Sequence, residues 1–120
     1  MLENIRRPFS VITIAGGYRQ GKSFLMNRLL LKIKKGFEVA GSVNACTKGI
    51  WVWSQVLEGQ YNGNPISYLV MDTEGLASIK ANPTHDLKIF CLSILTCSHF
   101  LYNSKGTIDE DAINKLSMCV

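Results

Sequence analysis

The chain has 120 residues, of which 47% are hydrophobic and 18% are charged. This composition is that of an ordinary globular domain, and nothing in it indicates disorder or repeats. The formal net charge of +4 comes from 13 basic and 9 acidic residues. Basic residues cluster only between Arg28 and Lys35, without interleaved aromatic side chains. We therefore expect a solvated helix face there and no nucleic-acid partner.

The cysteines and apolar segments indicate a cellular compartment. Neither C-x-x-C spacing nor a neighbouring histidine pattern accompanies the cysteines, which we expect to be reduced: Cys46, Cys91, Cys97 and Cys119. The first eight residues are polar and charged and do not resemble a secretion signal. The longest apolar stretch, Ile89 to Tyr102, is too short to span a bilayer. These features predict a cytoplasmic protein with no transmembrane segment in this chain.

The first two predicted elements flank a glycine-rich loop. An apolar run predicts a strand over residues 10–16, and apolar residues at helical spacing predict a helix over 22–35 that ends at Gly36. Between them, Gly16 to Ser23 fits the phosphate-binding pattern G-x-x-x-x-G-K-[ST]. Strand, loop and helix are the order that this motif requires. The competing interpretation is a glycine-rich turn in an unrelated α/β fold.

The loop pattern has a physical reason. Glycines let the backbone curl so that successive N–H groups face a phosphate, and the start of the helix adds partial positive charge. Lys22 would reach the β- and γ-phosphates, and Ser23 would ligate Mg²⁺. The predicted nucleotide-binding residues of this segment are Gly16, Gly17, Tyr18, Arg19, Gln20, Gly21, Lys22, Ser23 and Phe24.

The polar, glycine-punctuated segment from Gly36 to Lys48 is a candidate switch. Thr47 is placed to offer Mg²⁺ a hydroxyl and the γ-phosphate a backbone N–H. Loop threonines also cap helices and shape turns, so that interpretation of Thr47 stays open. An aromatic strand is predicted to follow over residues 50–57.

A second buried strand, predicted over residues 66–72, ends in Asp72 and is followed by Gly75. This D-x-x-G arrangement is typical of a carboxylate that holds Mg²⁺ and a glycine N–H that senses the γ-phosphate. In a parallel sheet, Gly16 and Asp72 would emerge at the same edge, where ligands bind. Alternatively, Asp72 only opens a turn that Gly75 shapes.

The rest of the chain predicts a helix over 84–94, a strand over 98–103 and a helix over 108–118 with an acidic first turn. Strands that alternate with helices indicate the α/β class with a mostly parallel sheet.

Five segments in this order resemble the guanylate-binding protein and atlastin group of dynamin-like large GTPases: G-G-Y-R-Q-G-K-S-F-L-M-N-R-L-L, G-F-E-V, T-K-G-I-W-V-W, V-M-D-T-E-G-L and F-L-Y-N-S-K-G-T-I. The resemblance covers nearly the whole chain. It implies a P-loop NTPase three-layer sandwich, in which the 50–57 strand is antiparallel at an edge. It also implies GTP as the substrate, Mg²⁺ as the cofactor and homodimerisation through the GTPase face.

The resemblance also assigns roles to single residues. It implies catalytic roles for Arg19, Lys22, Thr47 and Glu74, with Arg19 as an internal arginine finger and Glu74 in a network that positions the attacking water. Its metal ligands would be Ser23, Thr47 and Asp72, and its second switch would include Gly75. A surface ion pair is the other interpretation of Arg19. Many relatives carry a serine where this chain has Ala45, so hydrolysis is expected to be slower or to rely on the phosphate for proton transfer.

The resemblance implies a GTPase domain about twice as long as this chain. We therefore expect residues 1–120 to form a single partial GTPase domain that holds the phosphate-binding half, with the guanine-specificity half absent. Two other functions fit such a chain. One is a nucleotide-binding module that does not hydrolyse its ligand, and the other is an interaction module that associates with full-length relatives.

Overall fold

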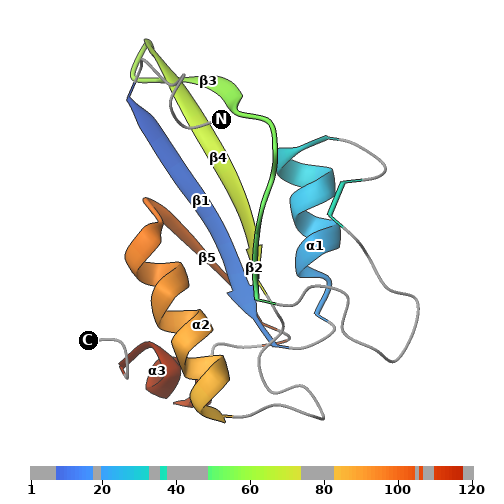
Figure 1. Cartoon of the computed structure of the whole chain (residues 1–120), viewed down its shortest axis with the longest axis vertical. Helices are drawn as coiled ribbons and strands as arrows, with labels where there is room; N and C mark the ends of the chain where they lie inside the picture. Colours follow the sequence, from blue (N-terminus) through green and yellow to red (C-terminus); the bar gives the residue numbers. More distant parts are fainter. Residues whose placement is uncertain are drawn as a thin grey trace.

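The centre of the molecule is β1 (Phe9–Gly16), which lies between two strands that run parallel to it. The computed structural model describes residues 8–17, 20–32, 36–37, 49–73, 83–104, 106 and 110–117. β4 (Asn64–Thr73) pairs with one side of β1, and β5 (His99–Asn103) pairs with the other (Figure 1). Ile14 is opposite Asp72 in β4 and Leu101 in β5. The described part of the chain therefore has the α/β fold that the sequence predicts. Its sheet is mixed, because these three strands are parallel and the other strands of the described part pair antiparallel with β4.

The two faces of this sheet are covered by different helices. Successive side chains of a strand point to opposite faces, and Ile14 and Ala15 accordingly belong to separate cores. On one face, α1 (Lys22–Leu25) continues directly into η2 (Met26–Leu30), a segment of π-helix. On the other face lies α2 (Pro83–Thr96) (Figure 1). The layers are thus helix, sheet and helix.

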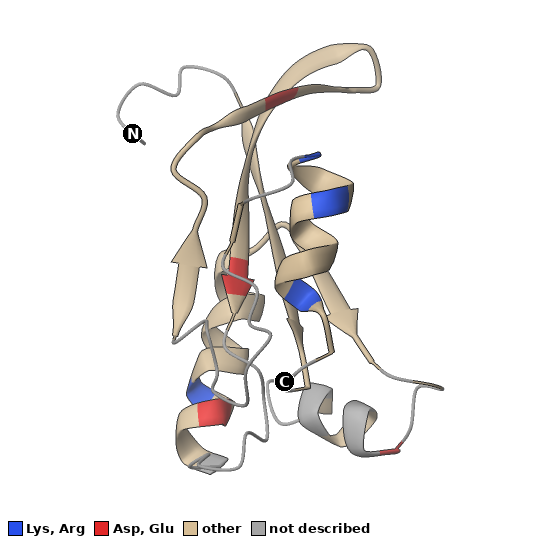
Figure 2. Cartoon of the chain, turned by 90° about the vertical axis from the view of Figure 1, so that its right-hand side faces the viewer, with Lys and Arg blue, Asp and Glu red and all other residues tan. Residues whose placement is uncertain are grey.

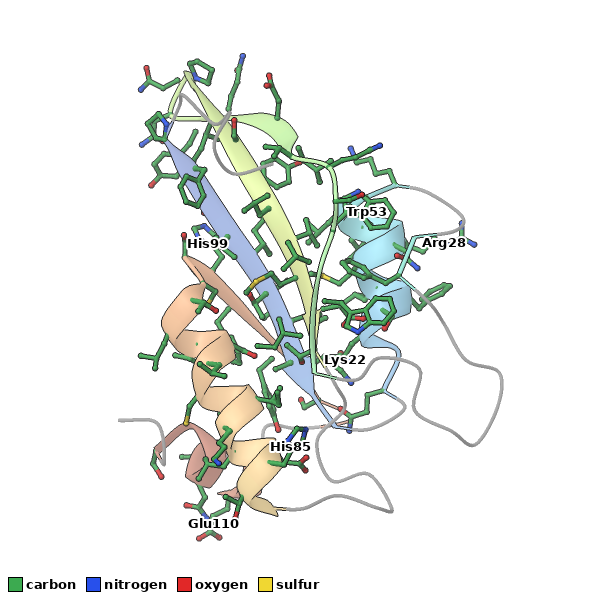
Figure 3. The ribbon with its side chains drawn as sticks, in the orientation of Figure 1. Lys22, Arg28, Trp53, His85, His99 and Glu110 are labelled. Atoms are coloured by element: carbon green, nitrogen blue, oxygen red, sulfur yellow. The ribbon has the colours of Figure 1, made fainter. Side chains whose placement is uncertain are left out.

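The α1-side core joins the sheet to the helix and to two residues beyond it. Its buried members are Ile14, Met26, Leu31, Phe37 and Val70. Trp53 packs against this cluster, and its ring meets the ring of Phe37 edge-on with a centroid distance of 5.5 Å. Figure 3 shows Trp53 beside α1. Apolar burial of this kind supplies most of the free energy that holds a short helix on a sheet.

The region predicted as one strand over 50–57 is two strands, and that prediction is corrected. β2 (Ile50–Val52) pairs antiparallel with Met71 to Thr73, whereas β3 (Leu57–Tyr61) pairs antiparallel with the amino-terminal part of β4. β3 and β4 are joined by Asn62 and Gly63, whose φ angles are 50° and 78°. Two positive φ angles at Asn-Gly are the signature of a tight type I′ hairpin turn. The antiparallel edge that the resemblance implied is therefore present, but it is built from two short strands.

The other predicted helices and strands are present in the structure, but their first and last residues differ from the prediction. The first helix ends at Leu30 rather than at residue 35, while α2 extends from 83 to 96 and β5 starts at 99. The last helix, α3 (Glu110–Ser117), lies towards the carboxyl end of β1 (Figure 1). Figure 2 shows basic residues along α1 and η2, acidic residues on β3 and β4, and residues of both signs on α2.

Candidate functional site

The loop after β1 is held tightly against the end of β5. Gly16 has a φ of 149°, and a Cβ atom there would lie 2.1 Å from the carbonyl oxygen of Asn103. Only glycine permits this approach of two backbones. At the other end of the loop, Gly21 takes a left-handed conformation with a φ of 77°, and its carbonyl oxygen accepts the Leu25 N–H at 2.8 Å. The loop thus turns directly into the first turn of α1, as the motif predicted.

Lys22 is the first residue of α1, and its side chain folds back over the loop. The side chain is 6% exposed, and its Nζ atom donates to the carbonyl oxygen of Gly17 at 3.0 Å. Burial lowers the pKa of the Lys22 ammonium, while the carboxylate of Asp72 opposes that shift. Figure 3 places Lys22 beside the carboxyl end of β1. A buried cation at a glycine loop is suited to binding an anion, because the anion compensates the lost hydration.

Ser23 and Asp72 come together from different elements. The Ser23 Oγ atom donates a short hydrogen bond to the Asp72 Oδ2 atom. Asp72 is fully buried, near the end of β4. The next residue, Thr73, fixes this strand end because its Oγ1 atom donates to the Ile14 carbonyl oxygen at 2.8 Å. The structure therefore brings together Lys22, Ser23 and Asp72 at one edge of the sheet.

Two amide side chains fix the loop. One belongs to Gln20 in the loop itself, and the other belongs to Asn103 in β5. The Gln20 Oε1 atom accepts the Gly17 N–H at 3.1 Å. The Asn103 Nδ2 atom donates to the Gln20 carbonyl oxygen at 2.6 Å. Because Asn103 ends the strand next to β1, it ties the loop to the sheet. This fixes the backbone that leads into Gly21 and Lys22.

The comparison with protein families gives one result. The family described as guanylate-binding protein, N-terminal domain, matches residues 1–120. The chain belongs to the guanylate-binding protein family.

Individual guanylate-binding proteins support the same assignment. The chain is similar to human guanylate-binding protein 4, with 42% identity over 117 residues, which are 97% of this chain and 18% of the relative. It is 44% identical to guanylate-binding protein 1 of Chlorocebus aethiops over 117 residues, covering 97% of this chain and 19% of the relative. With mouse guanylate-binding protein 3 it shares 42% identity over 118 residues, again 97% of this chain and 18% of the relative. The chain thus spans less than a fifth of the length of these relatives.

The donor atoms at Ser23 and Asp72 fit a Mg²⁺ ion. A hydroxyl and a carboxylate are hard oxygen ligands, and Mg²⁺ in nucleotide sites uses one or two protein ligands together with phosphate oxygens and waters. No group of three or more His, Cys, Asp or Glu side chains that could hold a metal occurs among the described residues. The pair fits an ion that arrives with an anionic ligand.

Several predicted site residues fall outside the part that the structure describes: Tyr18, Arg19, Thr47, Glu74 and Gly75. Ala45 lies outside it too. Phe24 is described, and its ring is half exposed, with the Arg28 guanidinium 5.5 Å from the ring centroid. The role of Phe24 in nucleotide binding stays a prediction.

Sequence reasoning missed Asn103 as part of the site. The available signal was an amide residue at the end of a strand predicted to lie parallel to the strand that carries the loop.

No helix in the described portion of the chain has the length and apolar character needed to cross a bilayer.

Proposed function

We propose that this chain binds GTP together with Mg²⁺ and hydrolyses it, as the phosphate-binding part of a guanylate-binding GTPase domain. The observation that carries the proposal is the meeting of Lys22, Ser23 and Asp72 at the glycine loop. In this assignment Lys22 exchanges its bond to the Gly17 carbonyl for bonds to the β- and γ-phosphates. The loop N–H groups and the start of α1 face the same phosphates.

The cation would be held by Ser23 and Asp72, with Thr47 as a third ligand. When bound, Mg²⁺ neutralises part of the phosphate charge. In the reaction, a water oxygen bonds to the γ-phosphorus and the bond from that phosphorus to the β–γ bridging oxygen breaks. GDP keeps the electron pair of that bond, and both protons of the water leave with inorganic phosphate as H₂PO₄⁻.

Three further residues have roles in this proposal. Arg19 neutralises charge that develops on the bridging and γ-oxygens, because a guanidinium has a fixed charge and a planar set of donors. Glu74 belongs to the network that positions the water, and the Gly75 N–H senses the γ-phosphate. Self-association of two GTPase faces brings Arg19 towards the nucleotide. We place the reaction in the cytoplasm.

The test is a titration of the purified 120-residue chain with fluorescent analogues of GTP, GDP and ATP, with and without Mg²⁺. Circular dichroism establishes that the chain is folded, and release of inorganic phosphate measures turnover. Mg²⁺-dependent binding with preference for GTP supports the proposal. Binding without turnover would favour the non-hydrolysing module, and no binding by a folded chain would favour the interaction module.

Arg19→Ala tests the arginine finger separately from binding. The variant should keep its affinity for GTP while turnover falls by about 10³-fold, because the guanidinium acts mainly in the transition state. Arg28→Ala is the matched control, since Arg28 is an exposed arginine of η2. Equal losses of affinity and turnover in Arg19→Ala would instead assign Arg19 to ground-state binding.

A further inference from the structure

Gly17 and Gln20 contact each other in two ways within the glycine loop. The Gln20 Oε1 atom accepts the Gly17 N–H at 3.1 Å. The same carboxamide also covers the Gly17 Cα atom, because a Cβ atom there would lie 2.5 Å from the Gln20 Nε2 atom and 2.8 Å from its Cδ atom. The glutamine side chain therefore fills the space that a side chain at position 17 would occupy. We call this contact the Gly17–Gln20 pair.

The two glycines at the start of the loop are small for different reasons. At Gly16 the obstacle to a side chain is the carbonyl oxygen of Asn103, which belongs to the backbone of the paired strand β5. At Gly17 the obstacle is the end of a flexible side chain, and the backbone there lacks the positive φ angle of Gly16. Alanine at position 17 therefore suits the backbone and excludes only the Gln20 amide.

The Gly17–Gln20 pair belongs to a series of hydrogen bonds that connects the sheet to Lys22. The Asn103 Nδ2 atom donates to the Gln20 carbonyl oxygen at 2.6 Å, which fixes Gln20 to β5. Gln20 in turn accepts the Gly17 N–H, and the Gly17 carbonyl oxygen accepts the Lys22 Nζ–H at 3.0 Å. The ammonium group that the proposed function assigns to the phosphates is thus positioned through Gln20 and Gly17.

This arrangement also limits what Gly17 itself can bind. A backbone N–H is a single donor, and the Gly17 N–H is used by Gln20. The Gly17 carbonyl is an acceptor and cannot bond an anionic ligand. The contribution of Gly17 to nucleotide binding is therefore indirect and passes through the position of Lys22.

We propose that Gln20 is a positioning residue that holds the loop in the shape used by polyphosphate ligands, and that Gly17 is glycine in order to admit its amide. This inference rests on the proposed function. The Gly17–Gln20 pair orders the loop before a ligand arrives, so less conformational entropy is lost on binding. Exchange of the Lys22–Gly17 bond for phosphate contacts is common to all variants. GDP and GTP share the phosphates next to the loop, so both depend on the pair.

The experiment is a double-mutant cycle of Gln20→Ala, Gly17→Ala and the double variant. Affinities for fluorescent GDP and for a non-hydrolysable fluorescent GTP analogue are measured with Mg²⁺ on chains that circular dichroism shows to be folded. Each single substitution should weaken both ligands by ~5-fold, as expected for the loss of one net hydrogen bond. The double variant should also be ~5-fold weaker, because the same bond is lost once, whereas independent effects would give about 25-fold.

A second measurement needs no nucleotide. Hydrogen exchange of the residue 17 amide, followed by NMR, reports its bond to Gln20 directly. Exchange should accelerate by ~5-fold in Gln20→Ala and in Gln20→Met, since methionine keeps the length of the side chain without the carboxamide. The Trp53 N–H, which donates to the Val70 carbonyl oxygen at 2.8 Å, should exchange at the wild-type rate. This comparison separates the loss of positioning from general destabilisation.

The matched control is Gln60→Ala. Gln60 is an exposed glutamine of β3, and the hairpin of β3 and β4 lies at the end of the sheet opposite the glycine loop (Figure 1). This substitution should leave both affinities and the exchange of the Gly17 amide unchanged.

Weaker binding in both single variants without further loss in the double variant, together with faster exchange at residue 17, supports the inference. Additive losses, unchanged affinity or tighter binding in Gln20→Ala overturns it while leaving the proposed function intact. Unchanged exchange of the Gly17 amide in Gln20→Ala overturns the Gly17–Gln20 pair itself. A folded wild-type chain that binds neither nucleotide overturns the proposed function and this inference with it. If Gly17→Ala does not fold, Gln20→Ala and Gln20→Met decide by affinity and exchange.

Discussion

The two faces of the sheet bury polar groups in different ways. On the α2 side, Phe90 contacts Phe100 and Tyr102 edge-on, and buried Ser93 bonds a carbonyl of its own helix. On the α1 side, Lys22 and Asn27 are buried with partners outside their helix. Burying a polar group costs free energy unless the group is hydrogen-bonded. A layer that only stabilises the fold does not need such groups. The α2 side therefore serves stability, whereas the α1 side carries the residues of the proposed nucleotide site.

The largest effect on the α2 side should come from Phe90→Ala. Removing a buried aromatic ring should lower the free energy of unfolding by about 3–5 kcal/mol, because transfer and cavity terms add. Urea denaturation followed by circular dichroism measures this loss. Nucleotide affinity, measured on the folded fraction, should change by less than about 2-fold. A strong loss of nucleotide affinity in the folded variant would show that the α2 side also contributes to nucleotide binding.

On the α1 side, Lys22→Ala should give the largest effect on binding. Loss of charged contacts to two phosphates should weaken GTP affinity by about 100-fold or more. Lys88→Ala is the control, since Lys88 is an exposed lysine of α2. The measurement is titration with a fluorescent GTP analogue under conditions where both variants are folded. Unchanged affinity in Lys22→Ala would contradict the assignment of the loop.

A smaller effect is expected from Asn103→Leu, which removes the hydrogen bond to the Gln20 carbonyl oxygen. GTP and GDP affinities should fall together by about 5-fold, because a looser loop affects the phosphates that both ligands share. The control is Ser98→Ala, because Ser98 Oγ accepts the Val11 N–H at the opposite end of the same strand pair. If both variants weaken binding equally, the loop is not the cause.

The smallest effect should be that of Ser93→Ala on stability. Its hydroxyl bonds the carbonyl four residues earlier, a contact that adds little to a helix. The free energy of unfolding should change by less than about 1 kcal/mol, as measured by urea denaturation. A larger loss would mean that the α2 layer also depends on buried polar bonds.

Local patterns carried much of the information about the fold. The predicted strand at 10–16, the loop and the start of the helix at Lys22 agree with β1 and α1, because backbone preference and apolar spacing act within a few residues. The β3–β4 hairpin was missed although its signal was local. Asn62-Gly63 between two strand-forming runs is the strongest short-range indication of such a turn.

By itself, the sequence determined the phosphate-loop pattern and the α/β class, and it selected Lys22, Ser23 and Asp72, which the structure brings together. Only the tertiary structure decided that Gln20 meets Asn103 and that Asn27 holds Phe37. An amide side chain has the same local preferences wherever its partner lies. Which backbone group it bonds depends on how the strands and helices pack, and that packing is not encoded in any short stretch of the chain.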